Sequence, residues 1–448
     1  MKARSRVGRS SQNEAGMTLI LVALAMVVLL AMSALAIDLV ALYVARNEAQ
    51  RAADAAALAG ATIFISQGCT NGVGGCVQNG PQEAPATAQA INVAAQNLVF
   101  GQAPSSSTVS TSFSYPNSEE PQITVTVYRD STHSNAMPTF FAKIFGLNTA
   151  NVSASATAEA YNPSGGNVSI GVSCLKPFLV PNCDPDHPVQ STSPVANKAC
   201  GGTSGGTNGV TIPCPNGVTG TCYPSYFFDP NNSGRLVNPG TYNPSNPTNS
   251  GVIGEPWQLH SDAAPSQWYL IGYTGNSGAE LRAFIQTCAP AVIACSSSLN
   301  TANGKKVGPV DQGINGLIHA SADGLGNGQD IICSPTTTPA CLSTPFKITG
   351  GANNPNPALV GKTLSAYTGS DSVASVAVYD GSALQPGGST VTVLGFMQLF
   401  IQDAIHLATD DLIDTVILSY GGCGTQLSSP PPLVTQGGST IPIRLIHQ

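Results

Sequence analysis

An uninterrupted apolar segment near the N-terminus places the strongest constraint on how this chain can fold. Met17–Ile37 contains no charged residue. As an α-helix this segment would span about 30 Å, the thickness of the hydrocarbon core of a bilayer. Basic residues precede it at positions 2, 4, 6 and 9, and Asp38 follows it directly. Because positively charged flanks stay on the cytoplasmic side, the pattern predicts a cytoplasmic N-terminus and an exported remainder.

The same segment has features of a cleavable secretory signal. Such a signal combines a basic start, an apolar region of about 7–15 residues and a small-x-small cleavage site. Ala34-Leu35-Ala36 could provide that site. However, the apolar run is longer than a typical signal, and helix-favouring residues continue without a breaker to about Phe64. The sequence therefore favours one retained helix of about 45 residues, with release by cleavage after Ala36 as the alternative.

The composition of the whole chain is that of a loop-rich exported protein. Only 9% of the 448 residues are charged, and the chain contains 47 Gly and 33 Pro. Average soluble domains carry about 25% charged residues. The formal net charge of −7 also provides no basic surface of the kind that binds nucleic acid. A helical cytosolic enzyme and a nucleic-acid-binding protein are both disfavoured.

The cysteine content predicts disulfide bonds and an oxidising compartment. The chain has twelve cysteines, and none forms the CxxC pattern of a zinc ribbon. Their pairing cannot be deduced from sequence alone. Several cysteines are close neighbours along the chain and are disulfide candidates: Cys69, Cys76, Cys214, Cys222, Cys288, Cys295, Cys333 and Cys341.

The N-terminal segment resembles a known family of bacterial pilus-assembly proteins. It runs from Glu14-Ala15-Gly16 through the apolar span to Asp38 and Tyr43, and then to AADAAALAGA at residues 52–61, which includes Asp54. This order is similar to the start of the TadE/TadG-like proteins of Tad (Flp) pili. A weaker similarity continues through a helix at 84–97, a strand at 122–130, and a short helix and final strand within 137–160.

The resemblance implies a single-pass inner-membrane protein with the bulk of its chain in the periplasm or cell envelope. It implies a structural component of a pilus-assembly or secretion apparatus, without enzymatic activity or cofactor. The implied partners are the lipid bilayer and other pilus-assembly or pilin-like proteins, and no nucleic acid. Leu21 stands where pilins carry a register-setting glutamate, so the resemblance is not to a major pilin. Ala23, Ala34 and Ala41 are small enough for membrane helices to pack closely there.

The predicted fold class is α+β, with a mostly-β, disulfide-linked C-terminal part. Ile123, Val125 and Val127 alternate with polar residues and are predicted to face a core. The apolar stripe Phe140, Phe141, Ile144 and Phe145 is also assigned to a core. The predicted parts are a basic tail (1–16), a transmembrane helix (17–37), its Ala-rich extension (38–66), a small α/β unit (67–160), a Gly/Pro/Asn-rich region (161–255) and the C-terminal domain (256–448).

Two short segments contain metal-binding residue types. CDPDH, Cys183–His187, combines a thiol, two carboxylates and an imidazole, and DPNNSG, residues 229–234, copies the first half of a calcium loop. The calcium loop lacks its twelfth-position glutamate, because Gly240 stands there. Turns are the favoured interpretation of both segments, with Cys183 in a disulfide, and no metal ligand is assigned.

The remaining function classes are weaker hypotheses. The chain has no GxSxG elbow and no phosphate-binding glycine motif. A secreted hydrolase is therefore the least favoured function. A secreted adhesin or binding module, released by signal cleavage, is the alternative to the membrane-anchored component.

Overall fold

The computed structural model is built from few helices and many short strands, and it confirms the predicted α+β class. It forms two compact units: residues 1–57, 90–112 and 124–156 make the first, and residues 58–89, 113–123 and 157–448 the second. The structure describes residues 12–70, 76–116, 120–162, 170–190, 212–215, 217, 219–229, 235–261, 267–272, 277–288, 291–302, 306–320, 328–332, 346–364, 369–380, 390–406, 410–423, 433–435 and 440–446.

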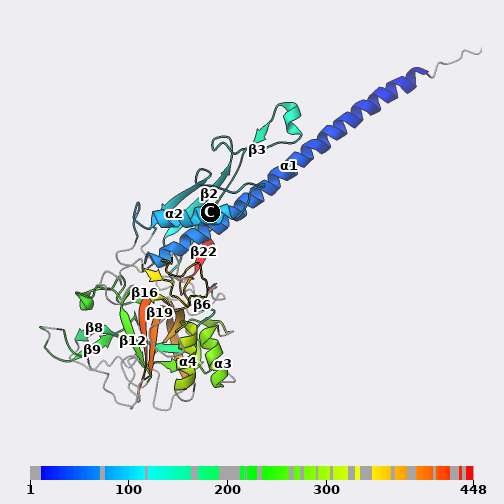
Figure 1. Ribbon diagram of the computed structural model, residues 1–448. Coiled ribbons are helices and arrows are strands. Elements are labelled where there is room, and N and C mark those ends of the chain that lie inside the picture. Colours follow the sequence, from blue (N-terminus) through cyan, green and yellow to red (C-terminus); the bar gives the residue numbers. More distant parts are fainter. Residues whose placement is uncertain are drawn as a thin grey trace, which may run out of the picture. The chain divides into compact units, whose positions relative to one another are not determined.

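Helix α1, Gln12–Ser66, is a single helix of 55 residues (Figure 1). It begins before the predicted start at residue 17 and ends at residue 66, where the predicted Ala-rich extension ends. Gly60 lies inside it and does not end it. The character of the helix changes along its length. Large apolar side chains are exposed from Met17 to Val44, whereas one face is buried from Ala45 onward. Small alanines dominate that buried face and allow close packing there.

Three strands that follow α1 in the chain form a four-stranded sheet with the last strand of the chain. Its order is β1 (Val109–Ser114), β2 (Gln122–Arg129), β5 (Val152–Ala160) and β22 (Ile443–Ile446). Ile123, Val125 and Val127 are fully buried, as their alternation predicts. β22 comes from the end of the chain and pairs antiparallel with residues 157–160 of β5. The same region contains α2 (Glu83–Ala95), β3 (Met137–Pro138), the 3-10 helix η1 (Ala142–Phe145) and β4 (Thr149–Ala150).

The second unit is built on a larger sheet. Its strands are antiparallel except β7 and β18, which run parallel. Their order is β12 (Pro256–His260), β20 (Asp411–Gly422), β19 (Thr390–His406), β18 (Val373–Tyr379), β7 (Phe178–Pro181) and β13 (Tyr269–Leu270), with β15 (Ser298–Asn300) also pairing with β19.

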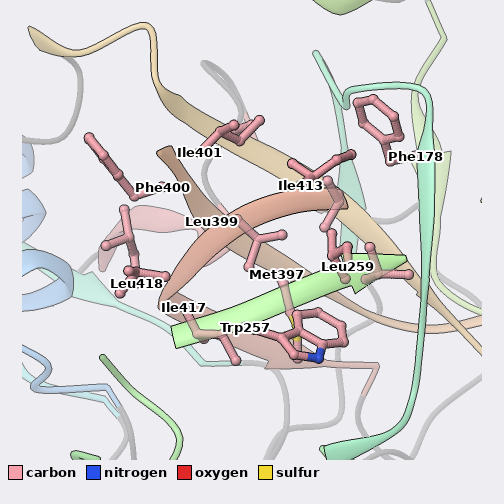
Figure 2. Close-up of a cluster of buried hydrophobic side chains, with 14 of the residues drawn as sticks. Phe178, Trp257, Leu259, Met397, Leu399, Phe400, Ile401, Ile413, Ile417 and Leu418 are labelled. Atoms are coloured by element: carbon pink, nitrogen blue, oxygen red, sulfur yellow. The ribbon is translucent and has the colours of Figure 1, made fainter. Parts of the chain in front are cut away.

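Both faces of this sheet are buried. In β18, Val376 and Val378 join one apolar cluster, while Ala377 and Tyr379 join another. Figure 2 shows side chains of the first cluster, including Trp257. Such two-sided burial explains why the strand reads VASVAVY, a nearly continuous apolar run, instead of alternating with polar residues.

Two helices contribute to the first cluster, α3 (Gly278–Gln286) and α4 (Val307–Leu317). Ser277 caps α3 by accepting a hydrogen bond from the N–H of Glu280. The remaining described elements are short: β6 (Ile170–Val172), β8 (Asp184–Gln190), β9 (Cys222–Ser225), β10 (Phe228–Asp229), β11 (Arg235–Leu236), η4 (Pro247–Asn249), β14 (Ile293–Ala294), β16 (Ile331–Ile332), β17 (Ile348–Thr349) and β21 (Leu433–Thr435).

The described cysteines form disulfide bonds, as the cysteine content predicts, and none of them is free. The candidates Cys69 and Cys76 bond to each other, and so do Cys214 and Cys222. Cys288 and Cys295 are sequence neighbours but have different, distant partners. The pairs Cys174–Cys288 and Cys295–Cys423 close loops with sequence separations of 114 and 128. The candidates Cys333 and Cys341 lie outside the described residues.

The C-terminal end of α3 is fixed by two neighbouring interactions. Cys288 forms a disulfide with Cys174. Lys176, two residues after Cys174, donates a hydrogen bond from its ammonium to the carbonyl of Thr287. Lys176 is buried, and this burial lowers the pKa of its ammonium to about 8, although the nearby Asp371 acts in the opposite direction. The lysine is therefore held at a helix C-terminus, where positive charge is favourable, at the cost of dehydration.

This lysine should make folding stability depend on alkaline pH. Between about pH 8 and pH 10.5 the unfolded chain binds more protons at Lys176 than the folded chain, so stability rises with pH. We expect the melting temperature of the wild type to rise relative to that of Lys176→Met between about pH 7 and pH 10. Thermal unfolding of both proteins in the same detergent measures this difference. Parallel pH profiles would show that the lysine is not held in a dehydrated site.

Candidate functional site

The first part of α1 presents apolar side chains on every side. From Met17 to Val44 nearly all of its large apolar residues are exposed; Leu24, for example, is 63% exposed. Water penalises such a surface by about 25 cal/mol for each Å². Within the described residues, α1 is the one helix whose length and composition suit a membrane span, although a signal sequence near an N-terminus has the same properties.

Asp38 is the one acidic residue within this exposed stretch, and its side chain turns away from the surrounding medium. It is 4% exposed and accepts hydrogen bonds from the backbone N–H groups of Phe140, Phe141 and Ala142, at 2.8, 2.9 and 2.5 Å. These N–H groups lie at the start of η1, where helical N–H groups have no partner within the helix. Asp38 therefore acts as a cap supplied from a distant helix, and its charge is satisfied without exposure.

Residues 139–148, here termed the exit loop, form the tip of a hairpin closed by β3 and β4. The N–H of Thr139 donates to the carbonyl of Asn148, and Gly146 ends η1 in a left-handed conformation with φ 86°. The loop also has a second link to α1. The N–H of Phe100 donates to Glu48, and the ring of Phe100 contacts that of Phe140 edge-on at 6.2 Å.

The prediction that the apolar stripe of this loop belongs to a core is wrong. Ile144 is 76% exposed and Phe145 is 60% exposed, and Phe140 and Phe141 are exposed as well. Within η1 only Ala142 is buried. A 3-10 helix of four residues is too short to bury a stripe, so the apolar side chains surround the capped backbone and point outward. Figure 1 shows this hairpin at β3.

Asp38 does not mark the end of the apolar surface. Leu39, Val40 and Tyr43 follow it and remain exposed. They line an open, mainly apolar groove of about 690 Å³ with Arg46 and with residues 151–153 at the start of β5. The carboxylate of Asp38 is turned inward, so the exposed surface of α1 does not become polar at residue 37, where the predicted transmembrane helix ends.

The other predicted site residues of α1 lie in different surroundings. Asp54 is half-buried and accepts a hydrogen bond from Gln50 at 2.8 Å, and Gln50 also donates to the carbonyl of Ser155 in β5. Ala23, Ala34 and Ala41 share one helix face, because spacings of 11 and 7 residues return to nearly the same helical angle. Ala23 is exposed, whereas Ala34 and Ala41 are half-buried. Their packing against another membrane helix stays a prediction.

The two candidate metal segments are placed only in part. CDPDH is not an isolated turn, because Asp184 begins strand β8, which pairs irregularly with β9. Cys183 is disulfide-bonded. Of DPNNSG, Asp229 ends β10, and residues 230–234 lie outside the described residues.

Residues 16–62 match the family model described as putative Flp pilus-assembly TadE/G-like. The N-terminal segment is therefore of the TadE/G-like type, which confirms the resemblance. The match includes Asp38 and Asp54 and covers about a tenth of the chain. No curated protein and no solved structure matches the sequence.

Removal of the Asp38 carboxylate should loosen the exit loop. Asp38→Ala leaves three N–H groups without an acceptor, and each such loss costs about 1–3 kcal/mol when the group stays buried. We expect faster hydrogen–deuterium exchange in residues 139–148, measured by mass spectrometry on the full chain in detergent. Asp54→Ala is the matched control, since Asp54 accepts only from a side chain in the same helix. Equal exchange in the wild type and Asp38→Ala would contradict the capping role.

Proposed function

We propose that this protein is a single-pass membrane component of a bacterial Flp/Tad pilus-assembly or secretion apparatus. One observation carries the proposal: the TadE/G-like segment, residues 16–62, contains an apolar helix that is exposed on all sides. In this arrangement the N-terminus is cytoplasmic, and the remainder lies in the periplasm or envelope. The role is structural rather than enzymatic, and the partners are the bilayer and other pilus-assembly or pilin-like proteins.

The exit loop adds a second membrane contact to the proposed anchor. Hydrogen bonds to Asp38 hold the loop beside the end of the span. Its exposed apolar residues are Phe140, Phe141, Ile144, Phe145 and Leu147. Phenylalanine and leucine are among the side chains that interfacial segments insert at the boundary between headgroups and acyl chains. The loop therefore lies in the outer interfacial layer, together with Leu39, Val40 and Tyr43 of α1.

The geometry also bears on the alternative of a secreted module. Cleavage after Ala36 would remove the predicted span, but Leu39, Val40 and Tyr43 would remain exposed. The apolar exit loop would also remain, because Asp38 lies after the cleavage site. A released protein would then expose a contiguous apolar patch to water, which favours association or aggregation. This consequence supports the retained anchor over the secreted adhesin.

Membrane retention can be measured directly. We expect the protein in the membrane fraction, with an intact mass and N-terminal sequence that include residues 1–36. High-salt and carbonate washes should leave it there, because a spanning helix does not depend on ionic contacts. A soluble chain that begins at Ile37 would refute the anchor and support the secreted module. A membrane-bound chain that begins at Met17 would instead indicate pilin-like processing.

Contact between the exit loop and lipid is tested by a tryptophan placed in the loop. We expect the fluorescence of Phe145→Trp in lipid nanodiscs to be quenched by lipids brominated near the headgroup. The native tryptophans, Trp257 and Trp268, are buried and give a constant background. Val292→Trp is the matched control, since Val292 is exposed but lies in the second unit. If the two variants are quenched equally, the loop does not contact the bilayer selectively.

A further inference from the structure

A cluster of buried polar side chains lies in the second unit, far along the chain from α1. Asp184 and His187 come from β8, and Glu255 directly precedes β12. Asp184 and Glu255 are 0% exposed, and His187 is 4% exposed. One nitrogen or oxygen atom from each of the three side chains lies within 4.8 Å of the others. The inference drawn from this cluster does not depend on the proposed pilus function.

The hydrogen bonds of His187 fix which ring nitrogen faces the cluster. Its Nε2 lies 2.9 Å from the carbonyl oxygen of Ser250, which can only accept, so Nε2 carries the hydrogen. Its Nδ1 points toward Asp184 Oδ2 at 2.7 Å and Glu255 Oε2 at 3.7 Å. In a neutral ring, Nδ1 would direct a lone pair at two carboxylates. The arrangement therefore requires positive charge at Nδ1 or close to it.

Asp184 and Glu255 differ in how their oxygens are satisfied. Asp184 accepts from the N–H groups of Asp186 and His187 and from the amide of Asn238, all at 3.2 Å. Neither oxygen of Glu255 accepts a hydrogen bond from any described residue. A buried carboxylate without a partner is strongly unfavourable, so Glu255 needs a proton or a cation.

A proton on Glu255 does not satisfy the site. Burial, together with the nearby Asp184 and Asp186 carboxylates, does raise the pKa of Glu255 well above its usual range. However, the resulting O–H would face His187 Nδ1 across 3.7 Å, which is too long for a hydrogen bond. A cation between the three side chains would contact all of them and would offset the charge of both carboxylates.

We propose that Asp184, His187 and Glu255 bind a structural divalent cation of the Zn²⁺ class. One imidazole nitrogen and two carboxylate oxygens form a donor set that Zn²⁺ accepts. Bond lengths of about 2.0–2.2 Å place tetrahedral ligand atoms about 3.3–3.6 Å apart, close to the observed His187–Glu255 separation. The shorter His187–Asp184 contact would open slightly as the cation enters. The carbonyl of Ser250 and the amide of Asn238 are hydrogen-bonded to His187 and Asp184, and such outer partners fix the orientation of metal ligands.

The cation would join two distant parts of the chain. His187 and Glu255 are separated by a long chain segment that contains β9, β10 and β11. Glu255 directly precedes β12, and its carbonyl accepts a hydrogen bond from Ile417 in β20, so it is fixed to the large sheet. A cation bound here would hold the two ends of this segment together beside the large sheet, in the way that a disulfide closes a loop.

The test uses the full chain in detergent, stripped with a chelator, incubated with Zn²⁺ and then desalted. We expect elemental analysis to find one retained Zn²⁺ per chain and thermal unfolding to shift upward by several degrees. Glu255→Gln should lose both effects. The metal-free variant should melt at or above the metal-free wild type, because the amide replaces a buried acid that must otherwise take up a proton or remain charged. That comparison separates loss of binding from loss of folding.

His319→Ala is the matched control for adventitious binding. His319 forms an exposed pair with Asp371 at 2.8 Å, outside the cluster, and its loss should leave the bound Zn²⁺ and the thermal shift unchanged. Two outcomes would overturn the proposal. The wild type could retain no Zn²⁺, in which case Glu255 is held as a neutral acid. Glu255→Gln could retain as much Zn²⁺ as the wild type, in which case the metal binds elsewhere.

Discussion

The hydrogen bonds between Asp38 and the exit loop connect two properties on which this part of the protein depends. They bury the one acidic residue of the exposed apolar stretch of α1, residues 17–44, and they hold a capped backbone against that helix. Without the carboxylate, the loop would have three unpaired N–H groups. Without the loop, α1 would carry a bare charge between Ile37 and Leu39, within its exposed apolar surface. The carboxylate therefore satisfies the N–H groups of the loop, and the loop in turn buries the charge of the carboxylate.

The larger sheet of the second unit is stabilised in a different way. Its central strands are buried on both faces, and two disulfides connect segments more than a hundred residues apart. Long closed loops lose conformational entropy in the unfolded chain when they are cross-linked, so these bonds favour the folded state. This stabilisation suits a chain with many glycines and prolines, whose short strands and irregular connections provide few local interactions.

Local patterns in the sequence predicted those elements whose stability is also local. The apolar run of α1 and the alternation of β2 are examples. Helix α4 was not predicted, because it contains Gly313, Gly316 and a proline. The glycine at position 313 is explained by tertiary packing and not by local helix propensity. A Cβ at Gly313 would lie 2.8 Å from the side chain of Ile285 in α3. The outward orientation of the exit loop likewise depends on Asp38, about a hundred residues away, and no local pattern encodes that contact.

Buried carboxylates perform a recurrent task in this weakly charged chain. Asp38 accepts from the exit loop, and Asp330 accepts from the N–H of Gly351 and the amide of Asn354. Asp410, which is only partly buried, likewise accepts from both the N–H and the hydroxyl of Ser261. In each case an acid organises a segment that is distant in sequence, and the donors of that segment offset its dehydration. Among the buried carboxylates of the described residues, Glu255 alone has two oxygens without a donor. The same physical rule that explains the other acids therefore requires a different partner for this one, and a cation is the partner that also satisfies His187 and Asp184.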